Sequence, residues 1–223
     1  MSKPILAAFI GASVLAFASG TVSGAGASAE DARTLGGCRI VSGALCPEAR
    51  LVGANLRGAD LARANFARAD LRGADLRRAN LRNINLRMAK LDRARLDGAV
   101  LVQAELHNAA LRRASLRGAG LDDADLQDAD LREADLRDAV LAGTRLQGAD
   151  LRGARLAGAD LSRADLSAAD LRGVHMRDAD LRGANLENAD LRNADLSHAR
   201  IDAGTRWRNA DTRGCKACPT ARR

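Results

Sequence analysis

The chain lacks the aromatic side chains that fill most globular cores. Among 223 residues there is no tyrosine, one tryptophan and three phenylalanines, so aromatics make up 2% of the chain. A composition this poor in aromatics normally indicates disorder. It also argues against a stacking platform for single-stranded nucleic acid. Any core of this chain must therefore be built from aliphatic side chains.

Catalytic and metal-binding motifs are missing as well. The sequence contains no phosphate loop, no HExxH and no nucleophile elbow, and its three histidines, His107, His175 and His198, are scattered. His175 and His198 fall on one side of the coil described below, but no ligand cluster accompanies them. We expect no enzyme activity, no cofactor, no metal site and no small-molecule substrate.

A hydrophobic run long enough to cross a membrane is also missing. The apolar run from Ile5 to Ala18 follows Lys3. As a helix it would span roughly 21 Å, which is short of a hydrocarbon core of about 30 Å. Small residues precede two candidate cleavage sites, after Ala18 and after Ala29. We therefore interpret 1–29 as a secretory signal peptide, with a retained anchor as the alternative, and expect a periplasmic or secreted protein whose mature chain has no membrane span.

What the chain has is a repeat with a period of five. An apolar residue recurs at every fifth position from Leu51 to Ile201, which makes 31 units, because (201 − 51)/5 + 1 = 31. Leucine fills 28 of these centres, and alanine stands two positions before the centre in 28 units. The centres that are not leucine are Phe66, Met176 and Ile201; the units without that alanine have Ile84, Thr144 and Val174 instead.

This period excludes a long helix and a single long strand. On a helix the leucines would advance by roughly 140° per unit and spiral around the axis. In one strand they would point alternately to opposite faces. Alanine and leucine two positions apart share a face, so each unit is locally strand-like and a bend must follow it. The chain is therefore predicted to wind into a solenoid with a dry core of alanine and leucine.

The motif Ala-(Asp/Asn)-Leu-X-X, repeated in tandem over 49–203, resembles the pentapeptide repeat family. The resemblance implies an all-β fold, a right-handed quadrilateral parallel β-helix with four pentapeptides per turn. The inferred divisions are a segment 30–48 that caps the N-terminal end, the β-helix over 49–203, and a C-terminal cap over 204–223. One extra residue at 202–204 shifts the repeat, and we expect Trp207 to plug the open end of the core.

The four cysteines flank the repeats. Cys38 and Cys46 precede them, and Cys215 and Cys218 follow them. Cysteines of an exported chain usually pair, and a disulfide needs Cα atoms about 4.4–6.8 Å apart. Since a rod separates its ends, we expect Cys38 to pair with Cys46 and Cys215 with Cys218. A redox or zinc role for the second pair lacks the surrounding motifs that such sites have.

Neither sign of charge dominates the outer positions. Without 1–29, which contains only Lys3, the chain has 34 basic and 28 acidic residues, a net charge of +6. With four units per turn, every fourth unit stacks, and eleven arginines that follow a repeat centre form columns on two adjacent sides. These are Arg57, Arg72, Arg77, Arg112, Arg117, Arg132, Arg137, Arg152, Arg172, Arg177 and Arg192.

Two interpretations of these columns stay open. They are a solvated surface copied by duplication, or a flat cationic face for an anionic envelope polymer, a nucleic acid or a protein. In the family, an acidic rod that mimics DNA can act on a type II topoisomerase, but a basic, exported chain does not fit that role. We expect a non-catalytic scaffold or interaction module for an unknown protein, with an anionic-polymer binder as the alternative and a DNA mimic third.

Overall fold

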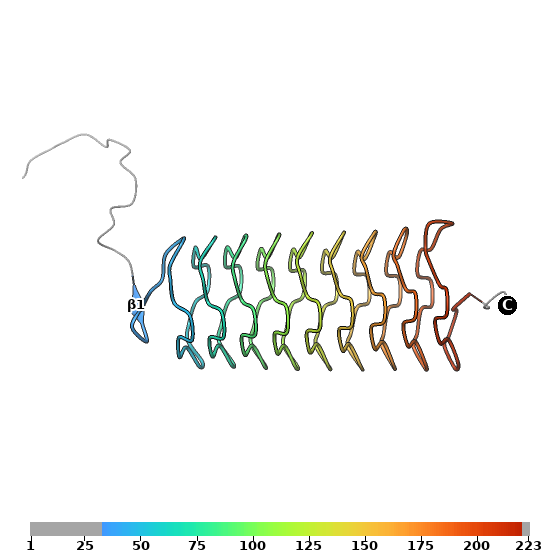
Figure 1. Cartoon of the computed structure of the whole chain (residues 1–223), viewed down its shortest axis with the longest axis horizontal. Coiled ribbons are helices and arrows are strands. Elements are labelled where there is room, and N and C mark those ends of the chain that lie inside the picture. Colours follow the sequence, from blue (N-terminus) through green and yellow to red (C-terminus); the bar gives the residue numbers. More distant parts are fainter. Residues whose placement is uncertain (1–32, 220–223) are drawn as a thin grey trace, which may run out of the picture. The chain divides into compact units, whose positions relative to one another are not determined.

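The computed structural model describes residues 33–219, which form a regular coil (Figure 1). The only strands in this part of the chain are β1, Thr34–Leu35, and β2, Cys38–Arg39. The described residues contain no helix, and hence none long and apolar enough to span a bilayer. The predicted signal peptide 1–29 and both of its candidate cleavage sites lie outside the described residues.

Successive coils are joined by parallel bridges of one residue each. The first bridge joins Leu45 to Asn65, and bridges with the same spacing continue as far as the one from Asp180 to Arg200. This spacing equals four pentapeptides, so each turn has four sides. Because every pentapeptide contributes one bridging residue rather than an extended strand, regular strands are sparse in this all-β fold.

We name the four sides by the pentapeptides that stack along them. Walls A, B, C and D hold the pentapeptides centred on Leu111, Leu116, Leu121 and Leu126, together with every fourth pentapeptide before and after each. In each pentapeptide the residue before the centre is the bridge position. The two residues after the centre are the first and second turn positions.

The core consists of the centres and the residues two before them. Ala129 is 1% exposed and Leu131 is 1% exposed. Thr144, which replaces an inner alanine, is fully buried, and its hydroxyl donates a hydrogen bond of 2.9 Å to the carbonyl oxygen of Leu121. The prediction that alanine and leucine point inward is confirmed along the repeats. Ile201, at the end of the array, is 43% exposed.

From Leu51 to Leu196, the turn of each pentapeptide has a left-handed backbone at its second turn position. This residue has a positive φ whether it is glycine, as Gly153 at 66°, or a larger residue, as Arg113 at 56°. Glycine adopts this conformation without strain, and asparagine and aspartate tolerate it better than other residues. The sequence predicts a bend at each unit, and the structure shows that a left-handed residue makes it.

In a typical stretch of five residues, 130–134, all five backbone N–H groups donate hydrogen bonds. Two bond forward to the next coil, one bonds back to the previous coil, one closes the turn, and one bonds to the aspartate of its own unit. These N–H groups are therefore satisfied without water. The bonds run from Leu131 to Asp150, Glu133 to Arg152, Asp130 to Ala109, Ala134 to Leu131, and Arg132 to Asp130.

A short hairpin and a disulfide precede the first coil. β1 and β2 pair antiparallel through the turn Gly36–Gly37, with φ of 55° and 78°. A Cβ atom at Gly36 would lie 2.7 Å from the carbonyl oxygen of Arg50, so only glycine fits there. Cys38 bonds to Cys46 with Cα atoms 5.6 Å apart. Cys46 already occupies a centre, so the coil begins inside the segment assigned to the N-terminal cap.

The last coil follows a shift in register. From Asn185 onward each bridge spans one residue more than before, as in Asn185 to Arg206, because one residue is inserted at 202–204. The Thr205 hydroxyl donates to the carbonyl oxygen of Leu181 at 2.9 Å, as Thr144 does to Leu121. Trp207 is half-buried and packs against the core. Cys215 bonds to Cys218 with Cα atoms 5.7 Å apart, so both disulfides have the expected pairing.

Candidate functional surface

Aspartate at the bridge position and arginine at the first turn position form a clip within one pentapeptide. In the unit centred on Leu131, the Asp130 carboxylate accepts hydrogen bonds from Arg132 Nε at 2.8 Å and Nη2 at 2.7 Å. The backbone N–H of Arg132 donates to the same carboxylate at 3.3 Å. The aspartate thus holds both the turn and the arginine, and the local sequence Asp-Leu-Arg is enough to build the clip.

The clip recurs along three walls and lowers the pKa of its carboxylates. The Arg132 guanidinium holds the pKa of Asp130 below its usual range, although partial burial raises it. The Arg77 guanidinium lowers the pKa of Asp75 to about 2. The described residues contain nine clips: Asp70–Arg72, Asp75–Arg77, Asp130–Arg132, Asp135–Arg137, Asp150–Arg152, Asp170–Arg172, Asp180–Arg182, Asp190–Arg192 and Asp211–Arg213.

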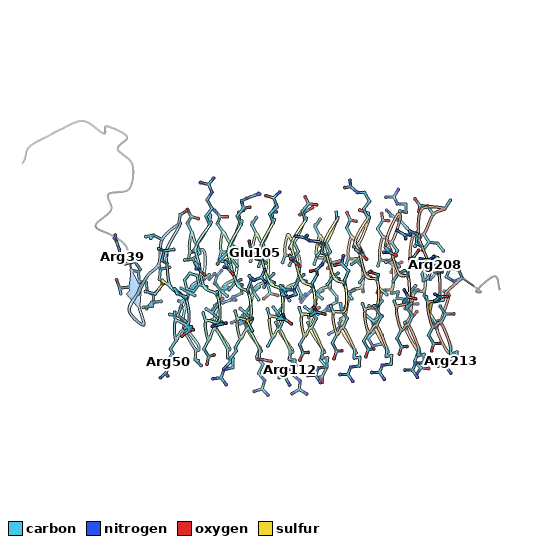
Figure 2. The ribbon with its side chains drawn as sticks, in the orientation of Figure 1. Arg39, Arg50, Glu105, Arg112, Arg208 and Arg213 are labelled. Carbon is cyan, nitrogen blue, oxygen red and sulfur yellow. A yellow bond between two sulfur atoms is a disulfide. The ribbon has the colours of Figure 1, made fainter. Side chains whose placement is uncertain are left out.

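On wall A the clips join into one ladder. Arg132 Nε also lies 3.4 Å from an oxygen of Asp150, the aspartate of the next coil. The same contact recurs in the following coils at 3.5 Å and 3.6 Å, up to Asp211. Each arginine is thus shared by two carboxylates. Figure 2 shows Arg50, Arg112 and Arg213 of wall A pointing away from the same edge of the coils.

The ladder is interrupted in the coils of Leu91 and Leu111. Lys90 and Ala110 occupy the bridge positions where later coils have aspartate, and Asp92 occupies a first turn position. Arg112 therefore has no carboxylate in its own pentapeptide. Its Nε lies 3.2 Å from Asp92 and 3.1 Å from Asp130, so it spans two neighbouring coils.

The eleven arginines proposed as an anion-binding face lie in columns on walls A and B, but most of them are occupied. Eight pair with a carboxylate: Arg72, Arg77, Arg112, Arg132, Arg137, Arg152, Arg172 and Arg192. Within the described residues, Arg57, Arg117 and Arg177 have no carboxylate within 4.0 Å, and all three lie on wall B. The columns are therefore largely neutralised.

On wall D two glutamines form a chain of hydrogen bonds that ends at an aspartate. Gln127 Nε2 donates to Gln147 Oε1 at 3.1 Å, and Gln147 Nε2 donates to Asp165 at 2.8 Å. His175 and His198 both belong to wall B, one coil apart, as expected. Among the described residues no group of three or more histidine, cysteine, aspartate or glutamate side chains could hold a metal ion.

In the sequence, a column of aspartates beside the arginines of wall A predicts Asp–Arg pairing across the face, but the third bond of the clip, from the backbone N–H, was not predicted. The signal was present, because aspartate or asparagine fills the bridge position in many units. These are the side chains that accept a hydrogen bond from the backbone two positions on. An asparagine serves the same turn, as Asn85 does for the N–H of Arg87 at 3.1 Å.

Comparison with known proteins agrees with this geometry. A model of the family of pentapeptide repeats matches four segments, 49–87, 79–118, 119–158 and 159–198, with eight copies. The chain is 32% identical in sequence to HetL, whose structure is known. HetL is a pentapeptide repeat protein involved in heterocyst differentiation regulation, from the cyanobacterium Nostoc sp. strain PCC 7120. The match covers 77% of this chain and 88% of HetL, with a TM-score of 0.36.

Full-length QnrB1, a plasmid-mediated fluoroquinolone resistance protein, is similar in structure with a TM-score of 0.61. The two share 20% identity over 73% of this chain and 86% of QnrB1, a likeness that bears on the fold alone. A comparison with curated proteins found no match. The family model covers most of the sequence, and the coil has the architecture that its repeats require, so the chain belongs to the pentapeptide repeat family.

Proposed function

We propose that this chain is an exported, non-catalytic scaffold that binds another protein through the outer walls of its coil. One observation supports this most directly. The inward positions from Leu51 to Leu196 hold closely packed apolar side chains and the hydrogen-bonded Thr144, so the polar chemistry lies on open walls. The carboxylates and guanidinium groups there are largely engaged with each other in clips. Such a surface suits binding better than turnover.

The proposal of export has two supports. The apolar run Ile5–Ala18 has the length and flanks of a signal peptide. Both cysteine pairs are close enough to be bonded, and structural disulfides persist in oxidising compartments. We therefore place the mature protein in the periplasm or outside the cell, and we take its coil to have the right-handed, quadrilateral form expected of its family.

Export predicts a shortened mature chain. When the full sequence is expressed in a Gram-negative host, the exported protein should begin at Glu30, or at Ser19 if cleavage follows Ala18. N-terminal sequencing and intact mass after cell fractionation measure this directly, and a variant with Leu6 and Ile10 both changed to Arg, which breaks the apolar run, is the control. A chain that keeps Met1 and stays in the cytoplasm would exclude export.

Scaffolding predicts contact with a partner through a defined wall. Ala110, Ser115, Gly120 and Asp125 are the bridge positions of four successive walls. A photo-activated cross-linking residue placed at each in turn, in the native host, should give a discrete protein adduct from one wall or from two adjacent walls. Adducts of equal yield from all four walls, or none at all, would contradict a protein-binding scaffold.

A binder of an anionic polymer is the second candidate, supported by the columns of arginine. Because the clips occupy most of these arginines, the arginines available for an anion lie on wall B. There Arg57, Arg117 and Arg177 lack a carboxylate partner among the described residues. Reversal of these three to Glu would abolish a salt-dependent affinity for a sulfated polysaccharide if this function holds. A DNA mimic is third and disfavoured, because this chain is basic where a mimic needs the negative charge of phosphates.

A further inference from the structure

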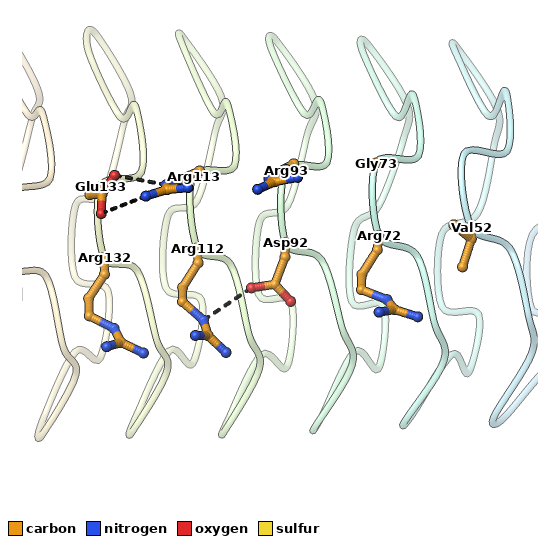
Figure 3. A pocket seen from close by; sticks show the side chains of 9 residues that line it. All are labelled: Val52, Arg72, Gly73, Asp92, Arg93, Arg112, Arg113, Arg132 and Glu133. Atoms are coloured by element: carbon orange, nitrogen blue, oxygen red, sulfur yellow. Dashed lines mark hydrogen bonds and ion pairs between the residues drawn. The ribbon is translucent and has the colours of Figure 1, made fainter.

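Wall A carries a groove where its ladder is interrupted. The groove has a volume of about 750 Å³ and is open to solvent. Figure 3 shows its lining in two rows, one of first turn positions and one of second turn positions. The lining residues are Val52, Arg72, Gly73, Asp92, Arg93, Arg112, Arg113, Arg132 and Glu133.

One side of the groove is a raised row of long side chains, the bank of the groove, which the rest of wall A lacks. Arg93, Arg113 and Glu133 occupy the second turn positions of three successive coils. Their long side chains stand beside the row of Asp92 and Arg112 (Figure 3). In the other coils of this wall the second turn position holds only a small side chain, so the wall there is flat. These residues are Gly53, Gly73, Gly153, Gly173, Asn193 and Gly214.

The groove has an excess of positive charge. Its lining has five arginines against Asp92 and Glu133, which gives 5 − 2 = +3. The neighbouring bridge positions add Lys90 and the clip carboxylates Asp70 and Asp130, so that the whole cluster has 6 − 4 = +2. Further along the ladder each clip is neutral. The excess has two sources: Ala110 stands where later coils have an aspartate, and Arg93 adds a positive charge at a second turn position.

The arginines of the groove differ in how fully they are engaged. Arg113 pairs with Glu133 through two hydrogen bonds, of 2.8 Å and 3.2 Å. Arg112 reaches carboxylates only in the coils before and after its own. Arg93 is exposed, and no carboxylate in residues 33–219 lies within 4.0 Å of it. In Figure 3 its guanidinium points along the bank toward Arg113.

We propose that this groove binds a compact, multiply charged oxyanion of the phosphate or sulfate class. A guanidinium offers N–H groups in a planar fork that matches such oxygens, and charge-assisted bonds of this kind are among the stronger ones. Arg93 and Arg112 supply the principal donors. Arg72 and Arg132 lie at the rim and stay in their clips, where Asp70 and Asp130 neutralise them. The inference is independent of the proposed scaffold function, because it concerns a site of a few residues.

The test uses inorganic pyrophosphate as the probe and the full, processed chain. Isothermal titration calorimetry at low salt should give one site on the unaltered protein. Arg93→Gln should weaken binding at least tenfold. Ala110→Asp supplies the missing clip carboxylate to Arg112 and should weaken binding as strongly, while thermal stability stays unchanged or rises. This second variant separates loss of the site from loss of the fold.

Two matched controls make the result specific. Arg163→Gln removes an exposed arginine from a second turn position on wall C, and Val140→Asp adds a carboxylate at a bridge position of the same wall. Both should leave the affinity within twofold. Binding that survives Arg93→Gln and Ala110→Asp, or that falls equally in the controls, would overturn the site.

A second titration separates two sources of the oxyanion. A sulfated oligosaccharide replaces pyrophosphate in the same set of variants. Affinity that depends on Arg93 for both probes supports a site for the oxyanion group itself. Dependence for pyrophosphate alone narrows the site to phosphates, and dependence for the oligosaccharide alone narrows it to sulfate esters. Absence of binding to either probe would refute the proposal.

Discussion

Replacing Leu131 with aspartate is expected to unfold several coils rather than one. Leu131 is 1% exposed, and its neighbours in the same stack, Leu111 and Leu151, are 0% exposed. Truncation of such a leucine to alanine costs about 2–5 kcal/mol. An unpaired carboxylate in the same place costs more, because nothing in the core can bond to it. Since a solenoid depends on contacts between neighbouring repeats, the damage spreads to the coils on either side.

Urea unfolding followed by circular dichroism, together with limited proteolysis and mass spectrometry, measures this effect. We expect a large fall in the unfolding midpoint and new cleavage between the coils of Leu111 and Leu151. Arg163→Asp is the control, since that residue is exposed and aspartate tolerates its left-handed backbone. Equal midpoints for the two variants would contradict the assignment of inward and outward positions.

Acid should destabilise the protein in a narrow range of pH. The clip arginines lower the pKa of Asp75 and of Asp211 to about 2, and the pKa values of Asp130, Asp135 and Asp190 are also lowered. A carboxyl group with a depressed pKa stabilises the folded state above its unfolded value of about 3.9, and this contribution is lost as the pH falls through the folded value. The loss therefore occurs between about pH 4 and pH 2.

Thermal melts from pH 6 to pH 1.5 test this prediction. Because many carboxylates titrate in the same window, we expect the melting temperature to fall by on the order of 10 °C between pH 4 and pH 2, and little between pH 6 and pH 5. A variant with Asp130, Asp150 and Asp190 changed to Asn should be less stable at pH 6 and show a smaller fall. A melting temperature that is constant down to pH 2 would show that the clips contribute nothing.

The inside of the coil could be predicted because a single physical rule sets it. Alanine and leucine two positions apart must share a face, and a bend must follow, and the shift after Ile201 follows from counting. The stacking of every fourth unit was implied by the resemblance to the pentapeptide repeat family, and the bridges confirm it. The disulfide pairs could be predicted for a similar reason. Cysteines at opposite ends of a stack of coils are too far apart to bond.

The turn could not be predicted in the same way. Its second position shows an excess of glycine, asparagine and aspartate, but arginines such as Arg63 and Arg113 dilute that signal. A left-handed backbone is rare for arginine, so sequence alone gives little reason to place it there. The coil imposes the conformation, because the N–H of this residue must reach the carbonyl oxygen of the next coil, as that of Arg113 does at 3.0 Å.

The groove of wall A was hidden for a different reason. Its two rows are assembled from successive coils, and its charge depends on what Ala110 lacks rather than on a motif. In the sequence, the usual order of aspartate before and arginine after the centre is reversed in two units. This reversal places Asp92 and Asp97 in the arginine columns and Lys90 in the aspartate column. The structure shows that Ala110 leaves Arg112 without a carboxylate in its own pentapeptide, and that the reversed Asp92 becomes one of its two partners in the groove beside Arg93.

The single-residue bridges also bear on how the open end of the coil avoids aggregation. In an ordinary sheet, the edge strand has a continuous row of unpaired backbone N–H and C=O groups, and a strand of another chain can pair with them. Here the pairing residues of the last coil, Arg206, Asp211 and Lys216, stand five positions apart and a turn separates each from the next. A foreign strand cannot follow such a path. Only another coil of the same pitch could pair with this edge.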